Sequence, residues 1–262
     1  MATKENKPII KLHWLNGSRA QGILFLLEEL EVPYELQIYH RTKDMLAPPE
    51  LAELHPLGKS PVVTIAKPDS SEPPLVLAES GFIIDYLCDH FGAGKNLMPK
   101  RWKDGQEGKP GGETEEWLRF RYLLYYPEGS LAPYLLMALL LNGLKGPRIP
   151  FLVRPITSAV ASRVMGMLVI PNLKSQLGFL EKQLETSPGG GDYLCGKDLT
   201  AGDVALAFPI LWGKTEFEGM GLTEAAFPRV WAYMERLEAR PGWKRASDKI
   251  REMEGSYSLL PQ

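Results

Sequence analysis

The first third of the chain alternates between strand-like and helix-like patterns. Apolar and polar residues alternate over Ile9–Leu15 and again over Tyr34–Tyr39, which is the period expected of β-strands. Between them Ser18 is a suitable N-cap for a helix from Arg19 to about Leu30, because apolar side chains recur there at helical spacing. These three segments predict a βαβ unit.

A second unit follows directly. Pro48-Pro49-Glu50 is typical of a short helix's first turn, where proline is tolerated. Apolar runs at 62–65 and 75–77 predict strands joined by the turn cluster 67–74, and 80–91 reads as a helix. The order βαβ, helix, ββα predicts a thioredoxin-like α/β domain.

The remainder of the chain carries helical patterns alone. Residues 92–113 have the Gly-, Pro- and charge-rich composition of a linker. Beyond them we predict helices at 114–126, 131–141, 156–168, 172–184, 201–211 and 227–238. The predicted organisation is therefore an N-terminal thioredoxin-like domain, residues 1–94, and a C-terminal helical bundle, residues 113–262.

One helix start in the second half has a recognisable cap. Thr200 stands three residues before Asp203, and an apolar run follows. This spacing predicts a capping box, in which each side chain bonds the other's backbone. Its predicted role is structural.

Composition narrows the function classes. The chain has 262 residues and a formal net charge of −2, which gives no support to nucleic-acid binding. The two cysteines, Cys88 and Cys195, form no CxxC motif, so we expect no disulfide framework and no metal site, and a reducing cytoplasmic location. The apolar runs 134–142 and 164–170 are interrupted, and we expect no membrane span, although association with a membrane surface stays open.

Two short motifs together indicate a ligand site. Ser60-Pro61 stands at the mouth of a strand, where a cis bond would turn the backbone of Ser60 outward to pair with an extended peptide. Glu79 precedes Ser80, a predicted N-cap whose helix start offers free N–H groups to a carboxylate, while Glu79 can hold an ammonium group. A γ-glutamyl peptide carries all three complementary groups.

These motifs resemble those of glutathione transferases, in particular a fungal theta-related group and bacterial serine-type relatives. The resemblance covers nearly the whole chain. It is carried by segments whose joint order and spacing are specific: 16–20, 25–30, 55–61, 79–80, 126–131, 200–203 and 240–243. Segment 142–171 looks longer than in compact members of the family.

The resemblance implies roles for individual residues. Ser18 matches the thiolate donor of serine-type members, and Asn16 is the rival donor. The positions that match the family's glutathione-binding residues are Arg41, Lys59, Ser60, Pro61, Glu79 and Ser80. Arg41 and Lys59 are alternatives for the glycyl carboxylate.

Three tyrosines are candidates for the second substrate's pocket. Tyr122, Tyr125 and Tyr126 lie on one predicted helix and could line a hydrophobic electrophile site. An aromatic stripe at helical spacing is more often core or dimer contact. Both interpretations are kept.

The implied function is conjugation of glutathione thiolate to an electrophile, with reduction of organic hydroperoxides as a further activity. Detoxification and defence against oxidative stress follow from that chemistry. Glutathione is then a cosubstrate, no metal is required, and the resemblance implies a homodimer. Two alternatives stand beside it: a glutathione-dependent disulfide reductase that uses Asn16, and a non-enzymatic glutathione-binding regulatory protein on the same fold.

Overall fold

A four-stranded mixed sheet organises the N-terminal part of the molecule. The computed structural model describes residues 7–68 and 70–259. In it the strand order is β2-β1-β3-β4, with β1 parallel to β2 and the other neighbours antiparallel. The strands are β1 (Ile9–Leu15), β2 (Tyr34–Tyr39), β3 (Val62–Ala66) and β4 (Leu75–Ala78).

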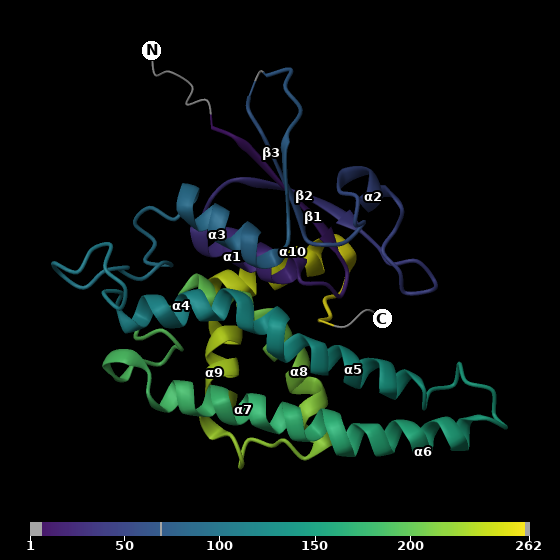
Figure 1. Ribbon diagram of the computed structural model, residues 1–262. Helices are drawn as coiled ribbons and strands as arrows, with labels where there is room; N and C mark the ends of the chain where they lie inside the picture. The colour runs from purple at the N-terminus through teal and green to yellow at the C-terminus, as the bar shows by residue number, and fades with distance from the viewer. Residues whose placement is uncertain (1–6, 69, 260–262) are drawn as a thin grey trace.

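Three helices complete this part: α1 (Ala20–Leu30), α2 (Glu50–Leu54) and α3 (Ser80–Phe91). Helix α1 is buried along nearly its whole length, since it contacts both the sheet side and the helices of the second half (Figure 1). Such a helix needs apolar side chains on most of its surface, as the run Ile23–Leu27 provides, and its last turn carries the polar pair Glu28 and Glu29. The predicted thioredoxin-like arrangement is confirmed.

The second half is helical, as predicted. Its longer helices are α4 (Glu115–Tyr126), α5 (Ala132–Gly143), α6 (Arg154–Val164), α7 (Ile170–Glu185), α8 (Ala201–Phe217), α9 (Pro228–Ala239) and α10 (Pro241–Glu254). Helix α4 runs on into α5, and α6 runs on into α7. These two long segments lie antiparallel below the sheet domain (Figure 1).

Two predicted helix breaks are wrong. π-Helical turns at Pro127–Leu131 and Met165–Val169 join α4 to α5 and α6 to α7 without interruption. Pro127 and Pro171 lack the N–H that an α-helix interior uses, and a π-turn changes the local bonding so that the helix continues. The sequence pattern shows the prolines but not this accommodation.

The joined helix also corrects the expectation about membrane spans. Arg154–Glu185 is 32 residues long and, by length and composition alone, apolar enough to cross a membrane, with 22% of its most apolar window buried. Its second half nevertheless packs in the core through Leu173, Leu177 and Leu180. The buried core helix of a globular protein can have the same length and composition. The unusual feature of this helix is that its apolar first half is exposed.

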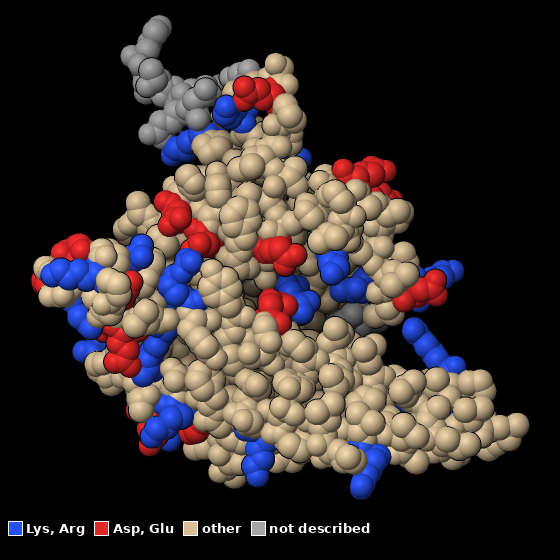
Figure 2. Space-filling model, in the orientation of Figure 1, with Lys and Arg blue, Asp and Glu red and all other residues tan. Residues whose placement is uncertain are grey.

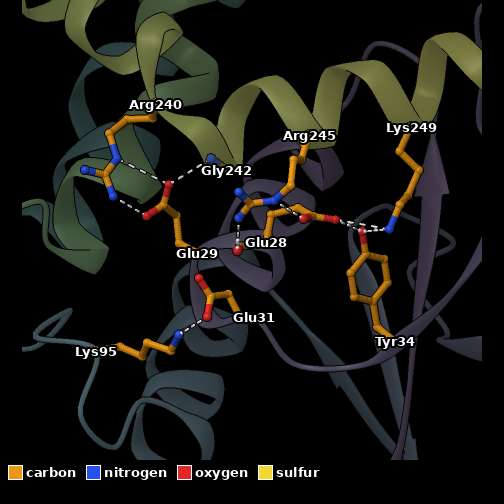
Figure 3. Close-up of polar contacts among 9 residues, drawn as sticks. All are labelled: Glu28, Glu29, Glu31, Tyr34, Lys95, Arg240, Gly242, Arg245 and Lys249. Atoms are coloured by element: carbon orange, nitrogen blue, oxygen red, sulfur yellow. Dashed lines mark hydrogen bonds and ion pairs between the residues drawn. The ribbon is translucent and has the colours of Figure 1, made fainter.

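Helix α10, which the sequence patterns did not predict, docks back onto α1. Glu28 on α1 accepts hydrogen bonds from Arg245 Nε at 2.8 Å and Lys249 Nζ at 3.1 Å, and from the Tyr34 hydroxyl (Figure 3). Burial alone would raise the pKa of Glu28, but these bonds outweigh it and lower the pKa. The end of the chain is thereby fastened to its first helix.

A second carboxylate next to it makes the same connection. Glu29 accepts from the Arg240 guanidinium and from the Gly242 backbone N–H at 3.2 Å (Figure 3). A Cβ at Gly242 would stand 2.4 Å from the Glu29 carboxylate, so a larger residue there would require the Glu29 side chain to shift. This contact holds the Arg240–Gly242 segment, at the junction of α9 and α10, against α1.

The predicted capping box at the start of α8 is confirmed. Asp203 is fully buried and accepts from the Thr200 N–H and hydroxyl, both at 2.8 Å. It also accepts from the Leu194 N–H at 3.2 Å and the Tyr233 hydroxyl at 3.0 Å. Burial raises the pKa of Asp203, while these four hydrogen bonds oppose that shift.

Candidate functional site

A cavity of about 360 Å³ opens between the two halves of the molecule. Its walls come from the start of α1, the loop before β3, the end of β4, the start of α3, the first π-turn and α5. The lining residues are Arg19, His55, Leu57, Lys59, Ser60, Pro61, Ala78, Glu79, Ser80, Glu128 and Leu136. The structure thus gathers the two sequence motifs, 59–61 and 79–80, at one site.

The loop before β3 presents backbone groups to this cavity. The Ser60-Pro61 bond is cis, as predicted. Among the described residues, neither the amide nor the carbonyl of Ser60 has a backbone partner. A donor and an acceptor of one residue are therefore free to pair with an extended ligand.

The start of α3 forms the opposite wall. Glu79 occupies the N-cap position with φ 71°. Its side chain makes no capping hydrogen bond to the described residues. The prediction that Ser80 is the N-cap is wrong by one position, because Glu79 adopts the left-handed conformation and Ser80 is already helical. A strained, open helix start facing a cavity is a common feature of binding sites.

Close packing fixes the position of this helix start. A Cβ at Gly81 would stand 2.9 Å from the carbonyl oxygen of Leu124 on α4. Glycine there lets α3 approach α4 directly, which brings Ser80 beside the π-turn that carries Glu128. The contact of α3 with α4 therefore also sets the position of the cavity wall.

The two candidate cations lie in different surroundings. Lys59 is exposed and lines the cavity. Arg41 does not line it: its Nε donates to the Asn16 carbonyl at 3.2 Å and its terminal nitrogens to the carbonyls of Gly17 and Met45. Of the two, Lys59 is the cation positioned toward a ligand, and Arg41 holds the turn after β1.

Neither of the two candidate thiolate donors, Ser18 and Asn16, is among the residues that line the cavity. Ser18 is buried, its hydroxyl donates to the Leu15 carbonyl at 2.7 Å, and it stands 3.2 Å from Ser60 Oγ. It does not cap a helix from Arg19, since α1 begins at Ala20, although Ser18 Oγ accepts from the Ala20 N–H at 3.2 Å. A turn of its hydroxyl toward a bound sulfur would exchange one hydrogen bond for another.

Asn16 is the more constrained of the two donors. Its side-chain oxygen accepts from the Arg41 backbone N–H at 2.8 Å. This bond fixes the amide's orientation and leaves its NH₂ group without a partner among the described residues. The geometry places both donors in the same turn and leaves the choice between them to experiment.

One pair of cavity residues escaped the sequence reasoning. The guanidinium of Arg19 and the carboxylate of Glu128 contact each other across the two halves of the chain, at the cavity mouth. They are 109 positions apart, so no spacing rule could pair them. Both residues lie within segments that carry the family resemblance, 16–20 and 126–131, and this membership was the available signal.

The three tyrosines do not share one environment. Tyr126 is buried and stacks on Tyr122, and both rings pack against Phe179 of α7. Tyr125 is exposed and lines a neighbouring cavity of about 290 Å³ together with Glu79, Ser80 and Phe82. Only Tyr125 of the three stands next to the candidate site.

The cysteines stand apart from this chemistry. Cys88 and Cys195 are both buried and unpaired. Burial raises the pKa of the Cys88 thiol to about 12 and raises that of Cys195 further, which disfavours the reactive thiolate. In the described ranges no group of three His, Cys, Asp or Glu residues is arranged to hold a metal ion.

Comparisons with known proteins agree with this geometry. Residues 17–90 match the family model of the glutathione S-transferase N-terminal domain, and residues 165–236 match that of its C-terminal domain. Glutathione S-transferase 1 of Saccharomyces cerevisiae is 29% identical over 250 residues, covering 95% of this chain and 99% of the yeast protein.

Solved structures give the same result. A glutathione S-transferase from Actinobacillus pleuropneumoniae is 29% identical, with a TM-score of 0.63 over 92% of each chain. A glutathione transferase from Phanerochaete chrysosporium, solved with oxidised glutathione, shares the fold at 19% identity, with a TM-score of 0.66 over 97% of this chain and 99% of that one. This chain belongs to the glutathione S-transferase family, with relatives among fungal and bacterial members.

Proposed function

We propose that this glutathione S-transferase conjugates the thiolate of glutathione to electrophilic carbon. The observation that carries the proposal is the single cavity that joins the free backbone of Ser60, the open helix start at Glu79 and the exposed cation Lys59. Glutathione offers a complementary group for each of these three features.

Each part of the tripeptide has a partner. The α-carboxylate of the γ-glutamyl end is held by the N–H groups at the start of α3 and by Ser80, and its ammonium group by Glu79. The cysteinyl backbone pairs with Ser60 beside Pro61, and Lys59 meets the glycyl carboxylate. Glutathione as the ligand is supported by two structures of the same fold that were solved with glutathione bound.

The thiol end then lies near the start of α1. A free thiol has a pKa near ~8.5, and lowering it by two units requires about 2.7 kcal/mol of preferential stabilisation of the anion. The N-terminus of α1, the Ser18 hydroxyl and the Arg19 guanidinium are the groups there that favour a negative charge. The electrophile sits on the α5 side of the cavity, toward Leu136 and Tyr125.

Titration of the thiolate's ultraviolet absorbance tests the proposal. Glutathione bound to the protein should show a thiol pKa below that of free glutathione, and an aromatic halide should be converted to its glutathione conjugate. Glutathione binding with an unshifted thiol pKa and no turnover would instead support a binding or regulatory protein. Turnover of mixed disulfides without conjugation would support the disulfide reductase.

Hydroperoxide reduction is a second activity of the same site. Two glutathione thiols would reduce one hydroperoxide to alcohol and water, and the thiols would leave as glutathione disulfide. Because both cysteines are buried, glutathione itself has to supply the electrons. We also propose a cytoplasmic role in detoxification and oxidative stress, which cell fractionation and electrophile sensitivity of a deletion strain would test.

A homodimer completes the proposal. The outer sides of α3 and α4 expose Phe82, Leu118, Tyr122 and Tyr125, each at least half exposed. Aromatic side chains of this kind are enriched in protein interfaces. Sedimentation equilibrium should give twice the chain mass, and Phe82→Ser with Leu118→Ser should shift the protein toward monomer.

A further inference from the structure

The loop and helix ends that join α5 to α6 form an apolar projection. We call residues 139–163 the hairpin tip; in Figure 1 it extends beyond the sheet domain. Leu140 is 64% exposed, Phe151 78%, Leu152 84% and Ile156 67%. Side chains of this size at such exposure, gathered on one projection, are typical of a surface that is covered by something else.

The charge of this region is one-sided. From Gly129 to Leu180 the sequence has no Asp or Glu, and it has five cations: Lys145, Arg148, Arg154, Arg163 and Lys174. Figure 2 shows the corresponding lower right lobe without acidic side chains. Within the described part of the chain, Arg148 and Arg163 are exposed and form no ion pair. Within the tip, the Asn142 side chain donates a hydrogen bond to the carboxylate of Glu216 on α8.

Exposed apolar side chains together with cations indicate what kind of surface covers the hairpin tip. A second copy of the chain docked tip to tip would bring a second cationic projection against the first, which charge repulsion disfavours. A span across the bilayer would have to remove α7 from the core, where Leu173, Leu177 and Leu180 are buried. An anionic lipid surface satisfies both properties, since apolar side chains enter the acyl boundary and cations meet the headgroups.

We propose that the hairpin tip docks this protein on an anionic membrane surface. This proposal does not depend on the conjugation reaction, because it is tested by the fraction of protein that binds to vesicles. Phe151 and Leu152, between the two helices, are the side chains that insert. Arg148 and Arg163 supply the attraction to the headgroups.

Co-sedimentation of the full chain with vesicles tests this directly. Binding should be strong on phosphatidylcholine vesicles that contain phosphatidylserine, weak on pure phosphatidylcholine, and reduced by high salt. Phe151→Ser with Leu152→Ser should lower the partition coefficient by at least ~30-fold. Arg148→Gln with Arg163→Gln should lower it by roughly 20- to 30-fold, since each cation near the surface is worth about a fivefold change.

Matched controls separate the tip from general surface effects. Leu46→Ser with Met253→Ser removes two apolar side chains, 65% and 52% exposed, elsewhere. Lys103→Gln with Lys109→Gln removes two exposed cations from the segment before α4. Both control proteins should bind vesicles like the unchanged chain. Far-ultraviolet circular dichroism and thermal unfolding check that every variant is folded.

Three results would overturn the proposal. Equal binding to neutral and anionic vesicles would remove the role of charge. No vesicle binding, with a change of oligomeric state in the Phe151→Ser, Leu152→Ser protein, would assign the tip to a second copy. Vesicle binding that resists alkaline carbonate extraction would indicate insertion of the long helix rather than docking of the tip.

Discussion

The starts of α3 and α8 use the same residue types for opposite purposes. At α8, Asp203 and Thr200 satisfy each other, and Asp203 takes two further hydrogen bonds from Leu194 and Tyr233. At α3, Glu79 stands next to Ser80 in a left-handed conformation, exposed, with no capping bond from its side chain. The first acid is fully used by the fold, and the second lines an open cavity, where we propose that it binds a ligand.

The comparison teaches that burial and partners, rather than the local motif, separate a stabilising acid from a binding acid. Asp203 has no exposed surface, so its oxygens have to be satisfied within the protein. Glu79 lines an open cavity, so water or a ligand can satisfy it. Mutation should therefore affect stability at one helix start and affinity at the other.

The largest effect is expected at the closed helix start. Asp203→Ala leaves the buried donors of Leu194, Thr200 and Tyr233 without their acceptor, and each such loss costs about 1–3 kcal/mol. We expect the free energy of unfolding, measured by urea denaturation, to fall by about 3–5 kcal/mol. The nearby exposed control Asp198→Ala should change it by less than about 0.5 kcal/mol. Equal losses in the two variants would contradict the assigned role of Asp203.

The open helix start should respond in affinity. Glu79→Ala removes the proposed partner of the γ-glutamyl ammonium, a charge-assisted bond of about 1.5–3 kcal/mol. The Kd of glutathione, measured by calorimetry, should rise about 10- to 150-fold, while the free energy of unfolding changes little. Glu53→Ala, an exposed acid on α2 outside the cavity, serves as control. Unchanged affinity in folded Glu79→Ala protein would remove Glu79 from the site.

The third helix start, at α1, sharpens the comparison because its serine is hydrogen-bonded within the fold and is also the proposed thiolate donor. Ser18→Ala should raise the pKa of bound glutathione by about one unit, roughly 1.4 kcal/mol, and lower kcat/KM at neutral pH. Asn16→Ala should do less, because Asn16 lies before Gly17 and further than Ser18 from the start of α1. Thiolate titration of both variants decides the matter. A shift in Asn16→Ala alone would reverse the roles, and a shift in neither would assign activation to backbone N–H groups.

The smallest effect is expected at a carboxylate that the fold uses at its surface. The pKa of Glu28 is lower in the folded protein than its unfolded value of about 4.3, so its contribution is present above that pH and is lost as the pH falls through the folded pKa. Unfolding measured from pH 7 to 3 should show a steeper acid loss for the unchanged chain than for Glu28→Gln. The difference should be below about 1 kcal/mol, and parallel curves would contradict it.

The sequence was sufficient where the determining interactions are local. The boundaries of β1 and β2, the cis bond before Pro61 and the capping box at Thr200 follow from patterns a few residues long. The two motifs of the cavity were predicted from their residues to form one ligand site, and the cavity brings them together. The predicted domain limits, 1–94 and 113–262, remain a prediction.

What the sequence missed depends on partners far along the chain. The Arg19–Glu128 contact and the docking of α10 on Glu28 and Glu29 join segments from opposite parts of the chain. The continuity of α6 with α7 depends on a π-turn that absorbs Pro171. The different surroundings of Tyr122, Tyr125 and Tyr126 depend on where Phe179 lies. None of these has a signature in local spacing.

The docking of α10 onto α1 has a consequence for synthesis. The chain emerges from the ribosome N-terminus first, and domains generally begin to fold in that order. Here α1 has its sheet early, but the carboxylates of Glu28 and Glu29 receive their cations only when Arg240, Arg245 and Lys249 have been translated. A chain that is terminated before Arg240 therefore leaves this face of α1 without its cations and exposes it to the cell's quality control.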